Sequence, residues 1–255
     1  MLWLAVFLLG ASIGSFLNVC IHRLPAEESI VYPPSKCPRC GAPIRPYDNV
    51  PLLSYLILRG RCRACAAPIS LRYPFVEALT GAAAVATVWR WGLAPEALAA
   101  FAFLGALIVV TFIDLDHQII PDVISLPGIV IGLALSLVLN EPGFLNAVFG
   151  VLLGGGLLYA VAFGYEWWTG REGMGGGDIK LLAMIGAFLG WRAVPVTLLL
   201  ASFAGSLIGV GVMIVRRANS RVAIPFGPFL AAGAACALFF GDTLIRWYLG
   251  LAVGV

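Results

Sequence analysis

Eight apolar stretches follow one another along the chain and constrain its fold more than any other feature. They lie at about residues 2–21, 73–91, 95–113, 122–140, 144–165, 178–191, 193–215 and 226–250. A stretch of roughly 17–25 apolar residues can cross a bilayer as a helix. The chain is 61% hydrophobic and only 11% charged, whereas a soluble domain has about 25% charged residues. We therefore expect an all-α polytopic membrane protein with about eight transmembrane helices.

The first stretch has the apolar centre of a signal peptide but lacks its other parts. Residues 1–21 contain no basic start and no small-residue cleavage site. We therefore expect residues 1–21 to be a retained first transmembrane helix.

Lysine and arginine residues are unevenly distributed among the loops. Of the 16 in the chain, eight lie in residues 22–72 and five more lie in later loops of the same side, which leaves three for the other side. Cytoplasmic loops of membrane proteins carry an excess of Lys and Arg. The sequence therefore predicts that the 22–72 segment is cytoplasmic and that both termini lie on the outer side.

Two Cys-x-x-Cys pairs lie in this basic segment: Cys37 with Cys40, and Cys62 with Cys65. Two such pairs at this separation are typical of a zinc site with four thiolate ligands. The segment is too short and polar to build its own core, so a structural zinc ion would supply the missing folding energy. Two disulfides are the alternative, but a cytoplasmic segment faces a reducing compartment.

Two aspartates stand at the ends of apolar stretches. Asp114 closes one stretch, and Asp178 follows the run Gly173-Met174-Gly175-Gly176-Gly177. An ionisable group in or beside a membrane helix is costly and is therefore a functional candidate. The predicted topology places both acids on the cytoplasmic side at similar depth, so they could form a pair. Close carboxylates titrate as a unit with one member ionised, which suits hydrolysis of a peptide bond by an activated water without a metal.

Other polar residues near the two aspartates have simpler explanations. Asp122 follows Pro121 at the expected start of a helix, where both residues suit the first turn. Asp116 and His117 are expected in a solvated loop. Asp178 itself has an alternative role as a helix N-cap after a flexible loop.

The glycine run before Asp178 lets another backbone approach closely, because glycine has no side chain to obstruct it. We expect Gly175, Gly177 and Lys180 to support the site, with Lys180 either tuning the charge of Asp178 or anchoring at lipid headgroups. Glu166 precedes two tryptophans typical of a membrane interface. A phosphate-binding loop is excluded, since no Gly-Lys-Ser or Gly-Lys-Thr follows.

In this order the motifs resemble those of the bacterial type IV prepilin peptidases, membrane aspartyl proteases of the G-x-G-D class. The resemblance extends along nearly the whole chain. Besides the cysteine pairs and the two aspartate motifs, it includes Gly14–Val19, His22–Pro25, Ile44–Pro51, Leu58–Gly60 and Pro225–Pro228.

The resemblance implies that Asp114 and Asp178 are the catalytic pair. It implies cleavage of the short basic leader from prepilins and pseudopilins, which enter laterally from the lipid bilayer at the cytoplasmic face of the bacterial inner membrane. It also implies methylation of the new N-terminus with S-adenosylmethionine, an activity associated with the cysteine-containing segment. We expect residues 14–72 to contribute to that second site.

The expected organisation has three parts: a first helix over 1–21, a zinc-binding segment over 22–72 and a seven-helix peptidase domain over 73–255. No nucleic-acid partner is expected, and the oligomeric state is left open. The alternatives are a peptidase without methyltransferase activity, a transporter that uses intramembrane acids, and a non-enzymatic assembly component. Acids that might bind the basic leader are Glu27, Glu28, Asp48, Glu166 and Glu172.

Overall fold

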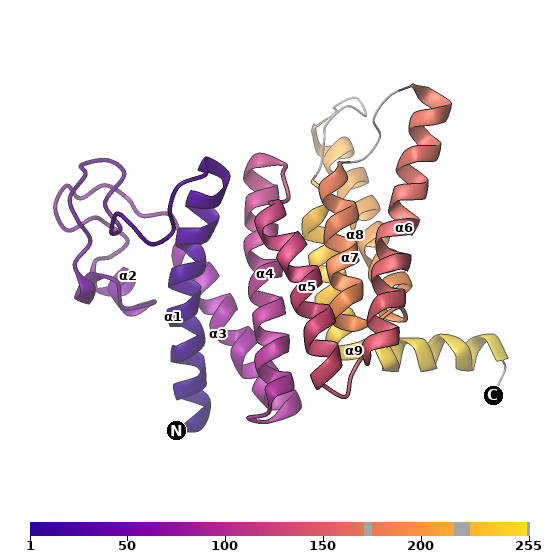
Figure 1. Ribbon diagram of the computed structural model, residues 1–255. Helices are drawn as coiled ribbons and strands as arrows, with labels where there is room; N and C mark the ends of the chain where they lie inside the picture. Colours follow the sequence, from indigo (N-terminus) through magenta and orange to yellow (C-terminus); the bar gives the residue numbers. More distant parts are fainter. Residues whose placement is uncertain (171–174, 217–224, 254–255) are drawn as a thin grey trace. The chain divides into compact units, whose positions relative to one another are not determined.

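The computed structural model describes residues 1–170, 175–216 and 225–253, and these residues form helices joined by loops, with no strand among them (Figure 1). The long helices coincide in position with the eight predicted stretches. They are α1 (Leu2–Arg23), α3 (Arg72–Trp91), α4 (Pro95–His117), α5 (Asp122–Val138), α6 (Phe144–Thr169), α7 (Gly176–Leu189), α8 (Ala193–Arg216) and α9 (Gly227–Val253). Short helical pieces lie between α1 and α3: η1 (Leu24–Ala26), η2 (Pro46–Asp48) and α2 (Leu53–Ile57). Gly173 and Met174 of the glycine run lie outside the described residues.

The helix lengths and compositions confirm the all-α membrane class. Among the described helices, α1, α4, α6, α8 and α9 are long and apolar enough to cross a membrane. The apolar helix α5 is shorter, at 17 residues. That α3, α5 and α7 also cross, which would give eight spans, stays a prediction.

The chain divides into two compact units, Met1–Val109 and Val110–Val255. In the first unit, α1 packs against α3 through small residues. A Cβ atom at Gly14 would lie 2.8 Å from the Cα atom of Glu77, and one at Gly10 would lie 2.6 Å from the Cβ atom of Ala84. Small residues of this kind let membrane helices approach closely. The buried Asn18 adds a hydrogen bond from its side-chain amide to the carbonyl of Tyr73, at 3.1 Å.

The residues between α1 and α3 form a compact module of loops and short helices (Figure 1). We call residues 24–71 the cysteine module, because they include both Cys-x-x-Cys pairs. The module contains η1, η2 and α2 and lies beside α1 in the first unit.

In the second unit, α7 is the enclosed centre, packed against α5, α6, α8 and α9. Its residues Leu181–Ala187 are all buried. Fourteen residues of helix span about 21 Å, which is less than the roughly 30 Å of a hydrocarbon core. The helix is held closely by α6, since a Cβ atom at Gly150 or Gly186 would collide with the backbone of the other.

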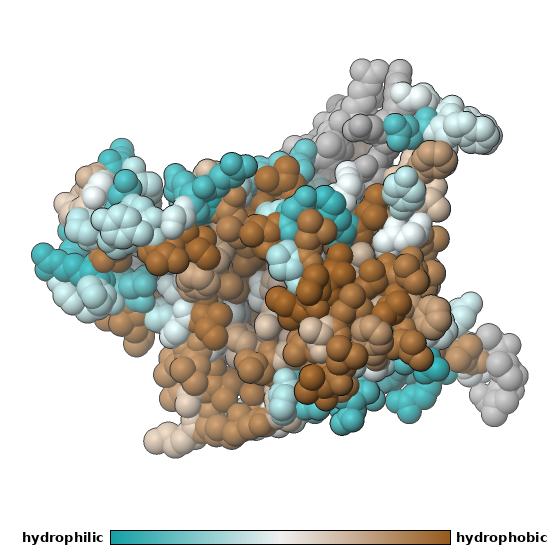
Figure 2. Space-filling model, viewed as in Figure 1, coloured by the Kyte–Doolittle hydropathy of each residue, from teal (hydrophilic) through white to brown (hydrophobic). Residues whose placement is uncertain are grey.

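Large apolar residues gather on the side of the second unit that Figure 2 shows, where they are drawn in brown. Leu145 and Leu152 of α6 are 70% and 64% exposed. Such faces would be unfavourable in water and suit contact with lipid. Trp167 and Trp168 at the end of α6 are almost fully exposed, as expected for residues at a membrane interface.

Candidate active site

Asp114 lies within the last turn of α4 and is buried, with only 5% of the residue exposed. Its Oδ2 atom accepts a hydrogen bond of 2.9 Å from the backbone N–H of Gly227, the first residue of α9. A Cβ atom at position 227 would lie 2.6 Å from that oxygen. Glycine is therefore required for the backbone to reach the carboxylate, and the carboxylate oxygen at this contact acts as an acceptor.

Asp178 lies in the first turn of α7 and is partly buried. Its carboxyl group interacts electrostatically with that of Asp114, so the structure brings the two predicted acids into one site within the second unit. The N-terminal end of a helix favours a negative charge. Asp178 therefore lies near Asp114 at the start of a helix whose central residues, Leu181–Ala187, form the core of the second unit.

The glycines before Asp178 differ in their surroundings. A Cβ atom at Gly177 would lie 2.8 Å from the Cβ atom of Ile120, so the loop between α4 and α5 packs directly against this glycine. Around Gly175, by contrast, a side chain would meet open space. The close approach expected of the glycine run therefore occurs at Gly177.

Lys180 pairs with Asp122 rather than with Asp178. Its Nζ atom lies 2.7 Å from both carboxylate oxygens of Asp122, and both side chains are partly exposed. The pair joins the first turn of α7 to the first turn of α5. Asp122 thus has a structural partner next to the two acids, in addition to its position at a helix start.

The remaining candidates around the acids face outward. Asp116 and His117 are exposed at the end of α4, and Glu166 is exposed near the end of α6. Among the acids suggested for leader binding, Asp48 is engaged by Arg63 in the cysteine module, and Glu172 lies outside the described residues.

The Gly227 contact is the feature of the site that sequence reasoning missed. The Pro-Phe-Gly-Pro motif at 225–228 was noted only as part of the resemblance. Gly227 and Asp114 are separated by 113 residues, and no periodicity connects them. The only local signal is a glycine at the start of an apolar stretch, between Phe226 and Pro228.

The four cysteines of the module converge on one point. The sulfur atoms of Cys37, Cys40, Cys62 and Cys65 all lie within 4.8 Å of one another, and those of Cys37 and Cys65 are 3.9 Å apart. Four thiolates at Zn–S distances of about 2.3 Å around one tetrahedral ion would be roughly 3.8 Å apart. The donor set and its spacing therefore fit a structural zinc ion.

Each cysteine pair lies on a tight turn of the same design. The N–H of Cys37 donates to the carbonyl of Ala42, and the N–H of Cys62 donates to that of Ala67. The residue after each second cysteine, Gly41 or Ala66, has a positive φ of 71° or 55°. This repeated turn aims both sulfurs of a pair to one side.

Backbone donors and hydrogen bonds among the thiols shift the pKa values of Cys37 and Cys65 in opposite directions. The N–H groups of Cys40 and Arg39 lower the pKa of Cys37 to about 6. The N–H of Ala67 lowers the pKa of Cys65, but burial and hydrogen bonds with Cys40, Cys62 and Cys37 outweigh it and raise the value to about 11. A bound metal requires all its cysteine ligands as thiolates.

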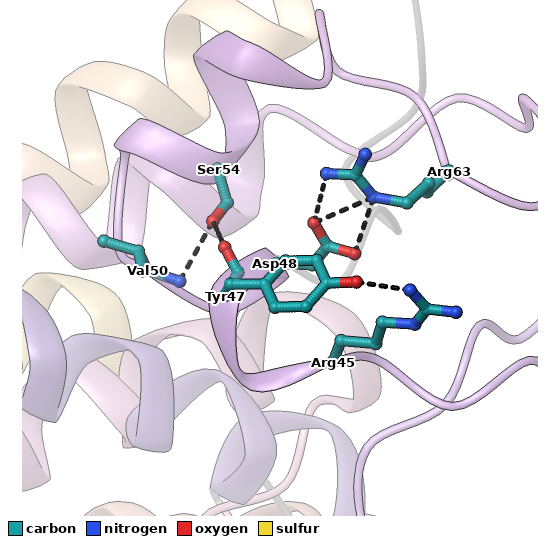
Figure 3. A network of polar contacts seen from close by, with 6 residues as sticks. All are labelled: Arg45, Tyr47, Asp48, Val50, Ser54 and Arg63. Atoms are coloured by element: carbon teal, nitrogen blue, oxygen red, sulfur yellow. Dashed lines mark hydrogen bonds and ion pairs between the residues drawn. The ribbon is translucent and has the colours of Figure 1, made fainter.

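A polar network connects η2 to the second cysteine pair of the module (Figure 3). Arg63 lies between Cys62 and Cys65 and holds Asp48 of η2 through both carboxylate oxygens, at 2.6–3.0 Å. This interaction lowers the pKa of Asp48. The guanidinium groups of Arg45 and Arg63 also lie over the ring of Tyr47, 5.8 and 5.6 Å from its centroid.

A second polar cluster connects the module to α1 and α3. The N–H of Leu52 donates to Oε2 of Glu77 on α3, at 2.8 Å. Leu52 has φ 62°, an unusual value for a residue with a side chain. The hydroxyl of Ser15 on α1 interacts with Glu77 and donates to Oδ1 of Asn49, at 3.4 Å. Two residues of this cluster belong to motifs that carry the family resemblance: Ser15 to Gly14–Val19, and Asn49 to Ile44–Pro51.

Two protein families match the chain in adjacent regions. The bacterial Peptidase A24 N-terminal domain matches residues 8–91, which include α1, the cysteine module and α3. The type IV leader peptidase family matches residues 101–210, which include Asp114 and Asp178. No solved structure matches the chain.

Several curated relatives align with almost the full chain, each with the printed name prepilin leader peptidase/N-methyltransferase. The protein from Aeromonas hydrophila is 42% identical over 268 residues, which cover 96% of this chain and 92% of the relative. The protein from Pseudomonas aeruginosa is 41% identical, with 98% and 94% covered. The protein from Burkholderia pseudomallei strain K96243 is 39% identical, with 91% and 84% covered. The chain therefore belongs to the type IV leader peptidase family.

Proposed function

We propose that this protein cleaves the basic leader from prepilins and pseudopilins with Asp114 and Asp178 as its catalytic pair, and methylates the new N-terminus. The names of the relatives support both activities. The observation that carries the peptidase proposal is the buried Asp114, held by the N–H of Gly227 and in electrostatic contact with Asp178.

In the proposed reaction the two acids have different roles. The N–H of Gly227 stabilises a charged oxygen of Asp114, so Asp114 is the ionised member. It takes a proton from water while the water oxygen attacks the peptide carbonyl carbon. Protonated Asp178 donates a hydrogen bond to the carbonyl oxygen. The C–N bond then breaks as Asp178 gives its proton to the leaving nitrogen, which leaves a carboxylic acid and an amine, and a proton that passes from Asp114 to Asp178 restores the pair.

Asp122 and Lys180 are proposed to position this pair rather than to take part in the chemistry. Their ion pair joins the first turns of α5 and α7. Gly177 lets the loop at Ile120 pack against the start of α7. Together these contacts would fix the direction in which Asp178 points, and Gly175 would leave open space for the substrate backbone.

The site is proposed to lie at the cytoplasmic face of the inner membrane, with both termini on the outer side. The excess of Lys and Arg in residues 22–72 supports this orientation. A prepilin carries its scissile bond next to an apolar helix, so it would reach the site laterally through the bilayer. The proposed domain organisation remains a first helix over 1–21, a zinc segment over 22–72 and a peptidase domain over 73–255.

Methyl transfer is proposed to belong to the first unit. When bound, S-adenosylmethionine would supply the methyl group. Ser15, Asn49 and Glu77 form a cluster of hydroxyl, amide and carboxylate groups, which suits the ribose hydroxyls and the amino group of such a cofactor. The Glu77 carboxylate is also a suitable acceptor for the proton that an N-terminal ammonium must lose before it reacts.

Zinc is proposed to hold the cysteine module in shape without taking part in either reaction. Its proposed ligands are Cys37, Cys40, Cys62 and Cys65, and their converging sulfurs support this. The module in turn supplies Asn49 and the N–H of Leu52 to the polar cluster. Loss of the metal should therefore affect the methylating unit first.

Cleavage of a prepilin-like substrate tests the peptidase proposal. Purified wild type is compared with Asp114→Asn, Asp178→Asn and Asp116→Asn, with the thermal unfolding of each variant measured in parallel. Folded but inactive variants at positions 114 and 178, with an active variant at 116, are the expected result. Activity that survives in both Asp114→Asn and Asp178→Asn would overturn the aspartyl mechanism.

Transfer of a labelled methyl group tests the second activity in the same preparations. A protein that cleaves prepilin but never transfers a methyl group from S-adenosylmethionine would be a peptidase alone. Glu77→Gln is expected to lose methyl transfer, and a zinc content equal to that of wild type shows that the cysteine module of the variant has folded.

A further inference from the structure

The helix α2 in the cysteine module is amphipathic, and the residues on its apolar face are exposed. Leu53, Leu56 and Ile57 are 53%, 69% and 73% exposed. Residues at these spacings share one face of a helix. On the other side, Ser54 is buried and its hydroxyl accepts the N–H of Val50 and donates to the carbonyl of Tyr47 (Figure 3). One face of α2 therefore packs on the module, and the apolar face points away from it.

The contacts of the residues just before α2 place it beside α1 and α3. Leu52, directly before α2, donates to Glu77, which lies five residues into α3, or about 7.5 Å along the helix axis. Asn49 contacts Ser15, which lies eight residues before the end of α1, or about 12 Å from that end. Ser15 is inside the candidate membrane span Leu2–Ala26. The chain directly before α2 is thus attached within the candidate span of α1 and not at its end.

The segment that contains α2 is basic. The segment 22–72 contains eight Lys and Arg residues against three acids, Glu27, Glu28 and Asp48. Asp48 is paired with Arg63, and Arg23 donates to the carbonyls of Ser29 and Pro33. Arg59 and Arg61, which follow α2 directly, are exposed. An apolar helix face flanked by Arg is typical of segments that lie in the interface of a bilayer with anionic lipids.

We propose that α2 is an interfacial anchor, with Leu53, Leu56 and Ile57 in the acyl chains of the cytoplasmic leaflet and Arg59 and Arg61 at anionic phospholipid headgroups. Both ends of the module continue into helices of the same bilayer, α1 and α3, so lipid is always within reach of this face. The net positive charge of the segment complements anionic headgroups. Figure 2 shows a mainly hydrophilic module with brown atoms on its lower side.

The proposed substrate leader is basic, so the basic segment 22–72 would repel it. A contact with anionic lipid gives these charges another role. The charges of the segment would be directed at the membrane rather than at the leader. The cysteine module would then be fixed at the membrane surface, where a substrate helix emerges. This last consequence rests on the proposed function, whereas the lipid contact holds whether or not the chain cleaves prepilins.

A fluorine reporter tests the depth of α2 in the full chain. The amino acid 4-trifluoromethylphenylalanine is placed at Leu56, at Phe16 as a lipid-facing reference on α1, or at Tyr32 as a reference beyond the α1 span; Phe16 and Tyr32 are 48% and 75% exposed. Each protein is studied by ¹⁹F NMR in nanodiscs that contain phosphatidylglycerol. The probes are a doxyl-labelled lipid and a water-soluble gadolinium chelate.

The expected result is that the doxyl lipid broadens the signals from positions 56 and 16, and that the gadolinium chelate broadens only the signal from position 32. A signal at position 56 that responds to the chelate as position 32 does would overturn the proposal. A signal that neither probe reaches would also overturn it, because protein, such as a second copy or another segment, would then cover α2.

Lipid composition tests the role of the arginines. The broadening at position 56 by doxyl lipid should be greater in nanodiscs with phosphatidylglycerol than in phosphatidylcholine alone, and Arg59→Gln/Arg61→Gln should lose this difference. Arg90→Gln removes a charge at the far end of α3 and is the control. This variant should still show greater broadening in nanodiscs with phosphatidylglycerol. If the double variant retains the full dependence on anionic lipid, the proposed headgroup contact is wrong.

Discussion

The backbone N–H of Gly227 donates to the Oδ2 atom of Asp114 at 2.9 Å, and a Cβ atom at position 227 would lie only 2.6 Å from that oxygen. This relationship joins the end of α4 to the start of α9 and gives one of the two acids a fixed donor. It also makes a glycine, which has no reactive group of its own, part of the proposed active site.

Gly227→Ala should therefore strongly reduce cleavage. The new Cβ atom would force Asp114 or α9 to move and would break a hydrogen bond to a charged group. Such bonds contribute about 1.5–3 kcal/mol, so we expect a loss of kcat on the order of 10- to 100-fold. Gly156→Ala on α6, where a Cβ atom meets open space, is the matched control and should retain activity. Full activity in Gly227→Ala would contradict the role of this contact.

Lys180 should act through Asp122 and not by tuning the charge of Asp178. Lys180→Met should lower kcat several-fold and leave the shape of the pH–rate profile unchanged, because the partner of Lys180 is Asp122. Exposed ion pairs contribute only about 0.2–1 kcal/mol, so thermal stability should change little. The charge reversal Asp122→Lys/Lys180→Asp should recover part of the activity. A shifted acid limb in Lys180→Met would indicate a direct effect on the catalytic pair.

The two cysteine turns should respond in opposite ways to matched substitutions. Gly41→Ala places a side chain at φ 71°, whereas Ala66→Gly removes one at φ 55°. A left-handed conformation costs a residue with a side chain about 1–2 kcal/mol, so Gly41→Ala should hasten zinc release to a chelator and Ala66→Gly should slow it. If both variants release zinc at the wild-type rate, the turns do not limit the stability of the site.

Removal of zinc should impair methylation more than cleavage. Cys37→Ser takes away one of the four converging thiols, and the loosened module would no longer hold Asn49 and Leu52 against Ser15 and Glu77. The two activities are measured in one preparation together with its zinc content. Equal loss of both would show that the module supports the whole fold. Cys236→Ser, at a thiol outside the cluster, is the control.

The Asp48–Arg63 ion pair should continue to stabilise the folded cysteine module throughout the mildly acidic pH range. Arg63 lowers the pKa of Asp48, so the folded value lies below the unfolded value of about 3.9. The stabilisation is therefore present above that unfolded value and is lost only as the pH falls through the lower folded value. Protection of residues 46–63 from hydrogen exchange, corrected for intrinsic rates, should be constant between about pH 5 and 7 in wild type and weaker in Asp48→Asn. A fall in wild-type protection across this window would contradict the assignment.

Periodicity and composition were sufficient to locate the long helices, because each apolar stretch is bounded by polar or glycine-rich loops. The cluster of four cysteines was predictable for a similar reason: spacing alone constrains Cys37 and Cys40, and Cys62 and Cys65, to share a turn. Long-range contacts had no such signal. Nothing in the local sequence relates Gly227 to Asp114, or Lys180 to Asp122 rather than to nearby Asp178. The bare face of α2 was missed because five residues are too few to produce a recognisable pattern.

The enclosure of α7 by other helices has a consequence for how the membrane acts on the enzyme. A helix in contact with lipid tilts or shifts when the bilayer becomes thicker or thinner. Asp178 is on a helix of about 21 Å whose central residues contact protein and not lipid. Hydrophobic mismatch would therefore act first on the helices that contact lipid, while the helix that carries Asp178 is insulated from it.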